Sequence, residues 1–329
     1  MDDDLITMIK EKAKMKRRKV VIAEGWDERC LEAVGIVLKE DIVDLILLGN
    51  PNEIKKKAKE VEVDISKAEV LDFKNYEKMD ELVKELVNLR KHKGLTEDEA
   101  RKLLENENYF ACMYVHCGHA DALVGSKICS TAELMKPVLQ ILREKGKLVS
   151  EVMVLYLKKI DKVLFTSDSS LNVDPSAEDL AQIGMDVASS VKALEIEPKA
   201  AFLSFSTYGS GGNGPQVEKV REAVSIAKKE MPEVLFDGEM QFDAAIDPYA
   251  AGRKCPDSPL KGGANIIVFP DLNSGNIWAH STFRTTENEM LFTLTSGLRK
   301  PAGILGRSTP AEFVVNMIYA VAMEANTHE

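Results

Sequence analysis

Arg307 is the only cation in GILGRSTPAEFVVN, a mostly apolar stretch from residue 303 to 316. It follows Gly306 at the end of a hydrophobic strand pattern, and the Ser-Thr-Pro that comes next is typical of a helix start. A guanidinium offers a planar pair of donors that fits a carbonyl oxygen or a phosphate. Taken alone, Arg307 is either a surface side chain or the centre of a functional site.

Three clusters of basic residues are candidates for binding an anion. The cluster around Ser130-Thr131 combines hydroxyl groups, backbone N–H groups and lysines at a helix start, which could hold an oxyanion or a phosphate. The same residues are also typical of an ordinary helix cap, and a basic run is typical of a solvated helix face. The clusters are Arg90–Lys93 in LRKHKG, Lys127 and Lys136 around Ser130-Thr131 in GSKICSTAELMKP, and Arg284 in HSTFRTTEN together with Arg307.

Two further motifs could carry chemistry. DGEMQFDAA (237–245) contains Asp237, Glu239 and Asp243, which could act as general bases or metal ligands. A strand-to-helix turn with capping residues is the favoured interpretation of this motif. The glycine-rich STYGSGGNGP (206–215) could wrap an anion with backbone N–H groups or form a mobile turn, and both interpretations stay open.

The cysteines and histidines predict no metal site. CMYVHCGH (112–119) lacks a second pair of ligands at the spacing that zinc sites use, so a core helix that ends at Gly118 is favoured. The five cysteines are an odd and scattered set, which favours reduced thiols in a cytoplasmic protein over a disulfide framework.

Short apolar runs alternate with helical patterns along the whole chain, which predicts an α/β fold with mainly parallel sheets. In such folds the ligand site lies beyond the carboxyl ends of the strands. The sequence has neither a G-x-G-x-x-G motif after an expected strand nor a P-loop motif, so it does not support a nucleotide site. The expected strands are 19–25, 42–50, 68–73, 120–125, 162–168, 200–206 and 265–271, and the expected helices are 27–40, 75–90, 96–104 with a Thr96–Glu99 capping box, one from Ala177 capped by Ser176, and 215–231 opening with Pro215.

Composition narrows the class of protein. The 329 residues suffice for two domains or one large one, and 45% hydrophobic with 29% charged residues is ordinary globular usage. A net charge of −10 argues against a general nucleic-acid binder, so an anion would need a locally basic pocket. No apolar run reaches the roughly 20 residues of a membrane helix, and the acidic start MDDDLITMIK lacks a signal core, so we expect neither membrane insertion nor secretion.

Several motifs, in this order, resemble the phosphate acetyltransferases and phosphate butyryltransferases nearly from end to end. FPDLNSGNI and DGEMQFDAA are the longest and the most specific to that family. The motifs are AEGWDERCLEAV (23–34), RKHKGLTEDEA (90–100), ADALVGSKICSTAEL (120–134), DSSLNVDPSAEDLAQI (168–183), LSFSTYGS (203–210), DGEMQFDAA (237–245), GGANIIVFPDLNSGNI (262–277) and GLRKPAGILGRS (297–308).

The resemblance implies reversible acyl transfer between acyl phosphate and coenzyme A, with acyl-coenzyme A, coenzyme A and inorganic phosphate as substrates and no further cofactor. It implies that Arg307 stabilises the charge of the transition state. It also implies a homodimer of two α/β domains, similar to isocitrate and isopropylmalate dehydrogenases, with the active site in the cleft between domain I (1–147 plus 303–329) and domain II (148–302). The residues expected to bind substrate are Arg90, Lys127, Ser130, Thr131, Lys136, Asn276, Arg284 and Ser308.

The chain departs from the family pattern around Arg307. The family reads Leu-Ser-Arg-Gly-Cys-Ser, whereas this chain reads Leu-Gly-Arg-Ser-Thr-Pro, so Gly306 stands where the family has a serine. The acid proposed as the thiol base falls on Phe313, and the adjacent Glu312 is a hypothetical substitute. Losing an oxyanion donor costs on the order of 10² to 10³ in rate, and a general base contributes roughly 10² to 10⁴.

Two functional hypotheses follow. In the first, the protein is an active phosphate acyltransferase in which Lys127, Ser126 and Ser308 replace the lost donors. In the second, a catalytically impaired relative binds or senses coenzyme A or acyl phosphate without turnover. A dehydrogenase, suggested by the implied fold, is a weaker third possibility, because neither a clear metal-binding acid cluster nor a nucleotide motif is present.

Overall fold

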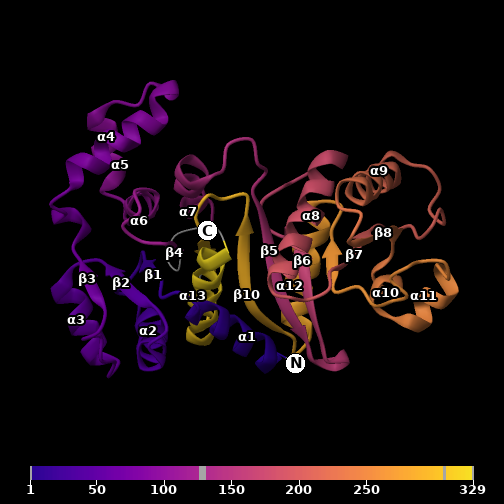
Figure 1. Cartoon of the computed structure of the whole chain (residues 1–329), viewed down its shortest axis with the longest axis horizontal. Coiled ribbons are helices and arrows are strands. Elements are labelled where there is room, and N and C mark those ends of the chain that lie inside the picture. The colour runs from indigo at the N-terminus through magenta and orange to yellow at the C-terminus, as the bar shows by residue number, and fades with distance from the viewer. Residues whose placement is uncertain (1, 126–130, 307–308, 328–329) are drawn as a thin grey trace. The chain divides into compact units, whose positions relative to one another are not determined.

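The computed structural model describes residues 2–125, 131–306 and 309–327. The chain folds into two compact units, each of which is described by itself (Figure 1). Unit 1 comprises Leu148–Leu291 and the first residues up to Asp4, and unit 2 comprises Leu5–Lys147 and Phe292–Glu329. The second boundary between the units falls between Leu291 and Phe292, inside strand β10 (Glu289–Ser296). The expected boundary between domain II and the returning segment of domain I is at residue 303. The functional domains 1–147 plus 303–329 and 148–302 stay a prediction.

Unit 2 contains a parallel five-stranded sheet. Its strands are β1 (Lys19–Ile22), β2 (Asp44–Leu48), β3 (Glu69–Leu71), β4 (Ala122–Gly125) and β11 (Ala302–Ile304). They lie in the order β11-β4-β1-β2-β3. Strands β1, β2, β4 and β11 are largely buried because helices cover a parallel sheet on both faces, whereas the edge strand β3 is only partly buried.

The helices of unit 2 lie before, between and after its strands along the chain. They are α1 (Asp2–Lys14, which begins in unit 1), α2 (Glu28–Glu40), α3 (Pro51–Glu60), α4 (Met79–Arg90), α5 (Glu97–Leu104), α6 (Glu107–His116), α7 (Thr131–Pro137), a π-helical segment (Val138–Leu142) and α13 (Ala311–Thr327), with 3₁₀ turns at Phe73–Asn75 and Lys91–Lys93. Helix α13 packs against α2, β1, β4 and β11, which is why it is apolar nearly all round. Figure 1 shows α4 and α5 beyond the sheet, with α6 between them and the strands.

Unit 1 is built on a mixed six-stranded sheet. Its strands are β5 (Ser150–Leu157), β6 (Lys162–Ser167), β7 (Lys199–Leu203), β8 (Leu235–Met240), β9 (Ile266–Val268) and the strand β10 shared with unit 2. The order is β10-β5-β6-β9-β7-β8. Strands β5 and β6 are antiparallel, whereas the pairs from β6 to β8 are parallel. The carboxyl ends of β6, β9, β7 and β8 therefore lie at one edge of the sheet.

Five helices pack around this sheet or follow its strands. They are α8 (Ala177–Ala193), α9 (Pro215–Glu230), α10 (Phe242–Ile246), α11 (Pro248–Lys254) and α12 (Leu272–Thr285), with a 3₁₀ turn at Lys158–Ile160. Helix α8 packs on α9 and on β6, β7 and β9. The approach of α8 to β7 requires glycine at 184, since a Cβ there would lie 2.4 Å from Cζ of Phe202.

Most of the predicted elements are confirmed. All seven expected strands form, the capping boxes of Thr96–Glu99 and Ser176–Asp179 are present, and Pro215 opens α9. CMYVHCGH lies mostly in the buried helix α6, followed by Gly118 at φ 80°. The strand pattern did not single out β5, β8 and β10; β8 reads LFDGEM, and its acidic residues interrupt the apolar run. Across the described parts of the chain, every helix falls short of the length and apolar character that crossing a membrane requires.

Candidate functional site

Strands β4 and β11 bring two of the predicted site segments together in unit 2. Ile304 pairs with Gly125, and the Leu305 N–H donates to the Gly125 carbonyl at 2.9 Å. The chain leaves both strands at the carboxyl edge, where ligands bind in parallel α/β sheets. The residues that follow, among them Lys127, Ser130, Arg307 and Ser308, lie outside the described residues.

Gly306 and Thr309, between β11 and α13, are joined by hydrogen bonds. The N–H and the hydroxyl of Thr309 both donate to the Gly306 carbonyl, at 3.1 and 2.7 Å. In the first turn of α13, Phe313 is 4% exposed and Glu312 is exposed. The side chain at 313 therefore belongs to the core, whereas that of Glu312 is open to solvent.

Arg90, Lys136 and Thr131 also belong to unit 2. Arg90 is half-buried at the end of α4, and Lys136 is exposed on α7, which begins at Thr131. Burial raises the pKa of Tyr109, and the charge of Arg90 opposes that rise, so the two side chains are close. The Tyr109 hydroxyl donates to Oε1 of Gln140 at 3.0 Å. This contact ties α6 to the π-helical segment that follows α7.

In unit 1 two carboxylates organise the loop after β6. Asp168 accepts from the N–H groups of Leu171 and Asn172, both at 2.9 Å. Glu151 accepts from the hydroxyls of Ser170 and Ser169 at 2.8 and 3.1 Å. Burial raises the pKa of Glu151 even though these hydroxyls oppose the rise. The loop after β6 is therefore held by hydrogen bonds to these two carboxylates.

Asn276 and Arg284 lie on one helix but not at one place. Nδ2 of Asn276 donates to the Ser169 carbonyl at 3.1 Å, which puts Asn276 beside the loop after β6. Arg284 is exposed in the last turn of α12, about 12 Å further along the helix axis at 1.5 Å per residue. Within unit 1, only Asn276 of these two predicted substrate-binding residues lies at the carboxyl edge of the sheet.

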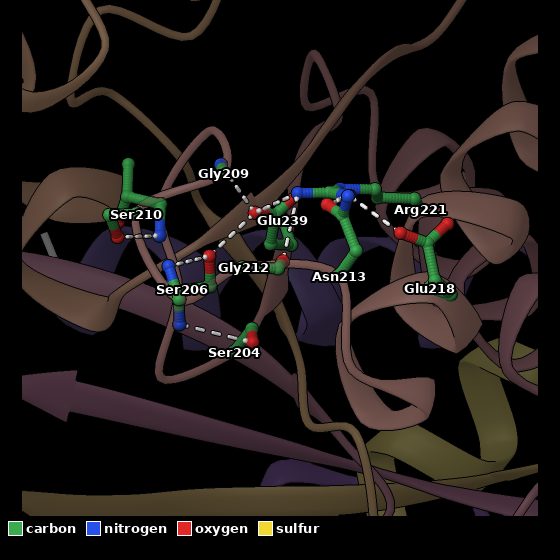
Figure 2. Close-up of polar contacts among 11 residues, drawn as sticks. Ser204, Ser206, Gly209, Ser210, Gly212, Asn213, Glu218, Arg221 and Glu239 are labelled. Carbon is green, nitrogen blue, oxygen red and sulfur yellow. Dashed lines mark hydrogen bonds and ion pairs between the residues drawn. The ribbon is translucent and has the colours of Figure 1, made fainter.

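The loop after β7 is joined to β8 by a buried glutamate. Glu239 is 2% exposed, and its Oε1 accepts from the Ser206 hydroxyl at 2.7 Å and the Gly209 N–H at 2.8 Å (Figure 2). Nε of Arg221 donates to its other oxygen at 2.8 Å. Burial alone would raise the pKa of Glu239, but the hydrogen bonds from Arg221, Gly209 and Ser206 together lower it.

A second buried carboxylate, Asp237, lies on the same strand. It is 3% exposed and accepts from the hydroxyls of Tyr208 and Ser258, both at 2.6 Å, and from Nζ of Lys228 at 3.1 Å. Burial and the hydrogen bond to Asp237 raise the pKa of Tyr208. The Tyr208 N–H donates to the Glu239 carbonyl at 3.2 Å. The backbone and the hydroxyl of Tyr208 are thus both fixed to β8.

DGEMQFDAA joins strand β8 to helix α10, which confirms the strand-to-helix turn, but its acids do not cap that helix. Asp237 and Glu239 lie within β8 and bind the loop after β7, whereas Asp243 pairs with Lys254 at 2.6 Å. The sequence analysis did not identify Arg221 as a residue of this arrangement. The one feature that could have identified it is its place early in the helix that follows the glycine-rich segment. Among the described residues, no three His, Cys, Asp or Glu side chains are grouped as a metal would need.

Comparisons with known proteins agree with the arrangement of strands and loops. A family model described as phosphate acetyl/butaryl transferase matches residues 4–322. The phosphate acetyltransferase of Bacillus subtilis is 40% identical over 322 residues, covering 98% of this chain and 99% of that protein. The phosphate acetyltransferase of Clostridium acetobutylicum is 37% identical over 329 residues, covering 98% of each.

Two solved structures show the same fold. A phosphotransacetylase from Streptococcus pyogenes has a TM-score of 0.91 at 36% identity, with 98% of both chains covered. The EutD phosphotransacetylase from Staphylococcus aureus has a TM-score of 0.89 at 35% identity, with 98% of this chain and 99% of that chain covered. Because the family model spans nearly the whole chain and these relatives match along their full lengths, the chain belongs to the phosphate acetyl/butaryl transferase family.

Proposed function

We propose that the protein is a phosphate acyltransferase that moves an acyl group reversibly between acyl phosphate and coenzyme A. The observation that carries the proposal is the end-to-end match to phosphate acetyltransferases. The carboxyl edges of both sheets, with polar loops after β6, β7 and β9 in unit 1, support it because ligands bind at such edges. We further propose that the enzyme acts as a cytoplasmic homodimer.

In the proposed reaction the thiol of coenzyme A loses its proton to a base. The resulting thiolate attacks the carbonyl carbon of the acyl phosphate, a C–S bond forms, and the C–O bond to the phosphate breaks with release of inorganic phosphate. Arg307 stabilises the negative charge that develops on the carbonyl oxygen and the leaving phosphate. Glu312, exposed at the start of α13, is the candidate base.

The remaining candidate residues would bind the two anionic substrates. In the sequence, Lys127 and Ser308 are donors close to those that the chain lacks, and Ser130-Thr131 is a hydroxyl pair of the kind that binds a phosphate at a helix start. Arg90, Lys136, Arg284 and Asn276 complete the proposed substrate-binding set.

A specific observation favours the second hypothesis, in which the protein binds coenzyme A or acyl phosphate without turnover. Phe313 stands where the resemblance implies an acid, and its side chain is 4% exposed in the core. Gly306 stands where the resemblance implies a serine, so the hydroxyl donor immediately before Arg307 is absent from the sequence.

Release of thiol from acyl-coenzyme A in the presence of phosphate tests the proposal, with acetyl, propionyl and butyryl donors compared. We expect turnover that Arg307→Ala reduces by about 10² to 10³, the cost of losing a transition-state donor. Arg17→Ala is the matched control, because Arg17 pairs with Asp41 and Asp44 on the surface of unit 2. No turnover with any donor, together with thermal stabilisation by coenzyme A, would establish the binding hypothesis instead.

A further inference from the structure

The loop 204–213 is more rigidly built than a surface turn requires. Glu239 takes up hydrogen bonds from three groups: the Ser206 hydroxyl, the Gly209 N–H and the guanidinium of Arg221. Burying a carboxylate is costly unless it is paired and hydrogen-bonded, and here that pairing holds a loop that follows β7 rather than a core element. The arrangement therefore fixes the shape of the loop.

Arg221 completes the arrangement with every nitrogen of its guanidinium. Nε and Nη2 donate to Glu239 at 2.8 and 3.2 Å, and Nη1 donates to Asn213 and Glu218 at 3.0 and 2.7 Å (Figure 2). These donors are engaged within the protein, so Arg221 is placed to hold the loop and not to bind a phosphate.

The loop also packs tightly on itself. The Ser206 hydroxyl that donates to Glu239 accepts from the Gly211 N–H at 2.9 Å. A Cβ at Gly211 would lie 2.6 Å from the ring of Phe205 and 2.8 Å from Cβ of Ser206. The loop therefore has its present shape only with glycine at 211.

Two aromatic side chains lie on the exposed surface of the loop, next to exposed glycine and polar residues. Phe205 is 65% exposed and Tyr208 is 43% exposed, and the loop that carries them is fixed from beneath by Glu239. Strand β7 pairs with β9, so the loop follows the strand next to the one that leads to Asn276. Two exposed aromatic rings at this edge suit the uncharged acyl-bearing arm of acyl-coenzyme A, with its methyl and methylene groups, better than they suit inorganic phosphate.

We propose that Glu239, held by Arg221, is a positioning residue that fixes the loop 204–213 as a binding wall for acyl-coenzyme A. This inference rests on the proposed acyltransferase function. It goes beyond that function because it assigns a role to Glu239 and the loop 204–213, which belong to other sequence motifs than Arg307 and Glu312.

The test uses the full-length protein and compares Glu239→Gln with Gly211→Ala. The first variant removes the charge at nearly constant shape, and the second disturbs the loop without touching the ion pair. We expect KM for acetyl-coenzyme A to rise about tenfold in both, while kcat and KM for phosphate stay within about twofold, because the loss is one of uniform substrate binding. Glu233→Gln is the matched control, since Glu233 forms an exposed ion pair with Lys192 at the other end of β8.

Hydrogen exchange of the peptide that covers 204–213 gives a readout independent of turnover. We expect exchange to be faster in both variants and slower in the wild type when acetyl-coenzyme A is added. Faster exchange with an unchanged KM for acetyl-coenzyme A would overturn the inference, as would a rise in the KM for phosphate alone or a lower kcat that follows a lower Tm.

The two proposals fail in distinguishable ways. A wild type without turnover but with the loop protected by acetyl-coenzyme A contradicts the acyltransferase function and retains the binding wall. A wild type that turns over but whose loop exchanges equally fast with and without acetyl-coenzyme A contradicts the wall. If Glu239→Gln does not fold, Gly211→Ala and Arg221→Lys carry the same comparison, because Arg221→Lys keeps the charge and loses the fork.

Discussion

At the scale of single residues, Gly306 stands in the sequence directly before Arg307, at the position where the family resemblance implies a serine. A Cβ at Gly306 would lie 3.3 Å from Oγ1 of Thr309. Apart from the chain neighbours of Gly306, no other atom of the described residues would lie within 4 Å of it. Thr309 is held by its own hydrogen bonds to the Gly306 carbonyl and has to shift by only a few tenths of an ångström. The described backbone thus has room for the serine that the family resemblance implies.

We predict that Gly306→Ser raises the rate of thiol release by about tenfold or more, because it restores a donor beside the transition-state cation. Gly306→Ala is the control, since it adds the same Cβ without the hydroxyl. A serine variant that is no faster than the alanine variant in the steady-state assay would mean that the chain has already replaced this donor.

At the scale of elements, the position of α8 on the sheet depends on one missing side chain. Gly184 lies in the middle of α8, and Phe202 on β7 is 0% exposed and packs edge-on against Phe236 at 6.1 Å. Close-packed interiors tolerate little additional volume, so the helix and the strand can approach this far only with glycine at 184.

We predict that Gly184→Ala lowers the free energy of unfolding by about 1–3 kcal/mol, the usual cost of overpacking a core. Thermal unfolding followed by circular dichroism measures the effect. The double variant Gly184→Ala/Phe202→Leu should recover part of the loss, because the smaller side chain relieves the contact. Equal Tm values for wild type and Gly184→Ala would show that the helix can move away without cost.

At the scale of the whole molecule, buried carboxylates make stability depend on pH. Oε2 of Glu324 is buried and has no hydrogen-bond partner among the described residues, and burial raises the pKa of Glu324 from 4.5 to about 8. Burial and the nearby Glu24 likewise raise the pKa of Glu107 to about 7. At neutral pH the folded protein therefore keeps a proton on Glu324 that the unfolded chain releases.

The sign of the effect follows from proton counting. Between pH 4.5 and about 8 the unfolded state binds fewer protons than the folded state, so the contribution of Glu324 to stability falls as the pH rises and is constant above about 8. We predict that Glu324→Gln raises Tm at pH 8 by at least about 2–4 °C, the effect of roughly 1 kcal/mol in a large domain.

The difference between Glu324→Gln and wild type should shrink as the pH falls to 4.5 and below, because the unfolded wild type then increasingly keeps the same proton as the folded state. Calorimetry across this range measures it. Glu97→Gln is the control, since Glu97 is exposed on α5 and the same change of side chain there removes no buried carboxyl. A constant Tm difference at every pH would assign the effect to packing rather than to a proton.

The sequence by itself determined the local structure and the family. The apolar runs at residues 19–25 and 200–206 predicted buried strands, and Thr96 and Ser176 predicted helix starts, because periodicity and capping depend on neighbours along the chain. The motifs around Asn276 and Glu239 also sufficed for the resemblance to the acyltransferases.

Only the tertiary structure decided which of these residues meet. Strand order places β9 between β6 and β7, and it brings Asn276 to the loop after β6 while the helical rise carries Arg284 away. The contact between Ser206, Arg221 and Glu239 joins residues from a loop, a helix and a strand. Spacing along the chain does not encode such contacts, because they depend on how parallel strands line up at one edge of a sheet.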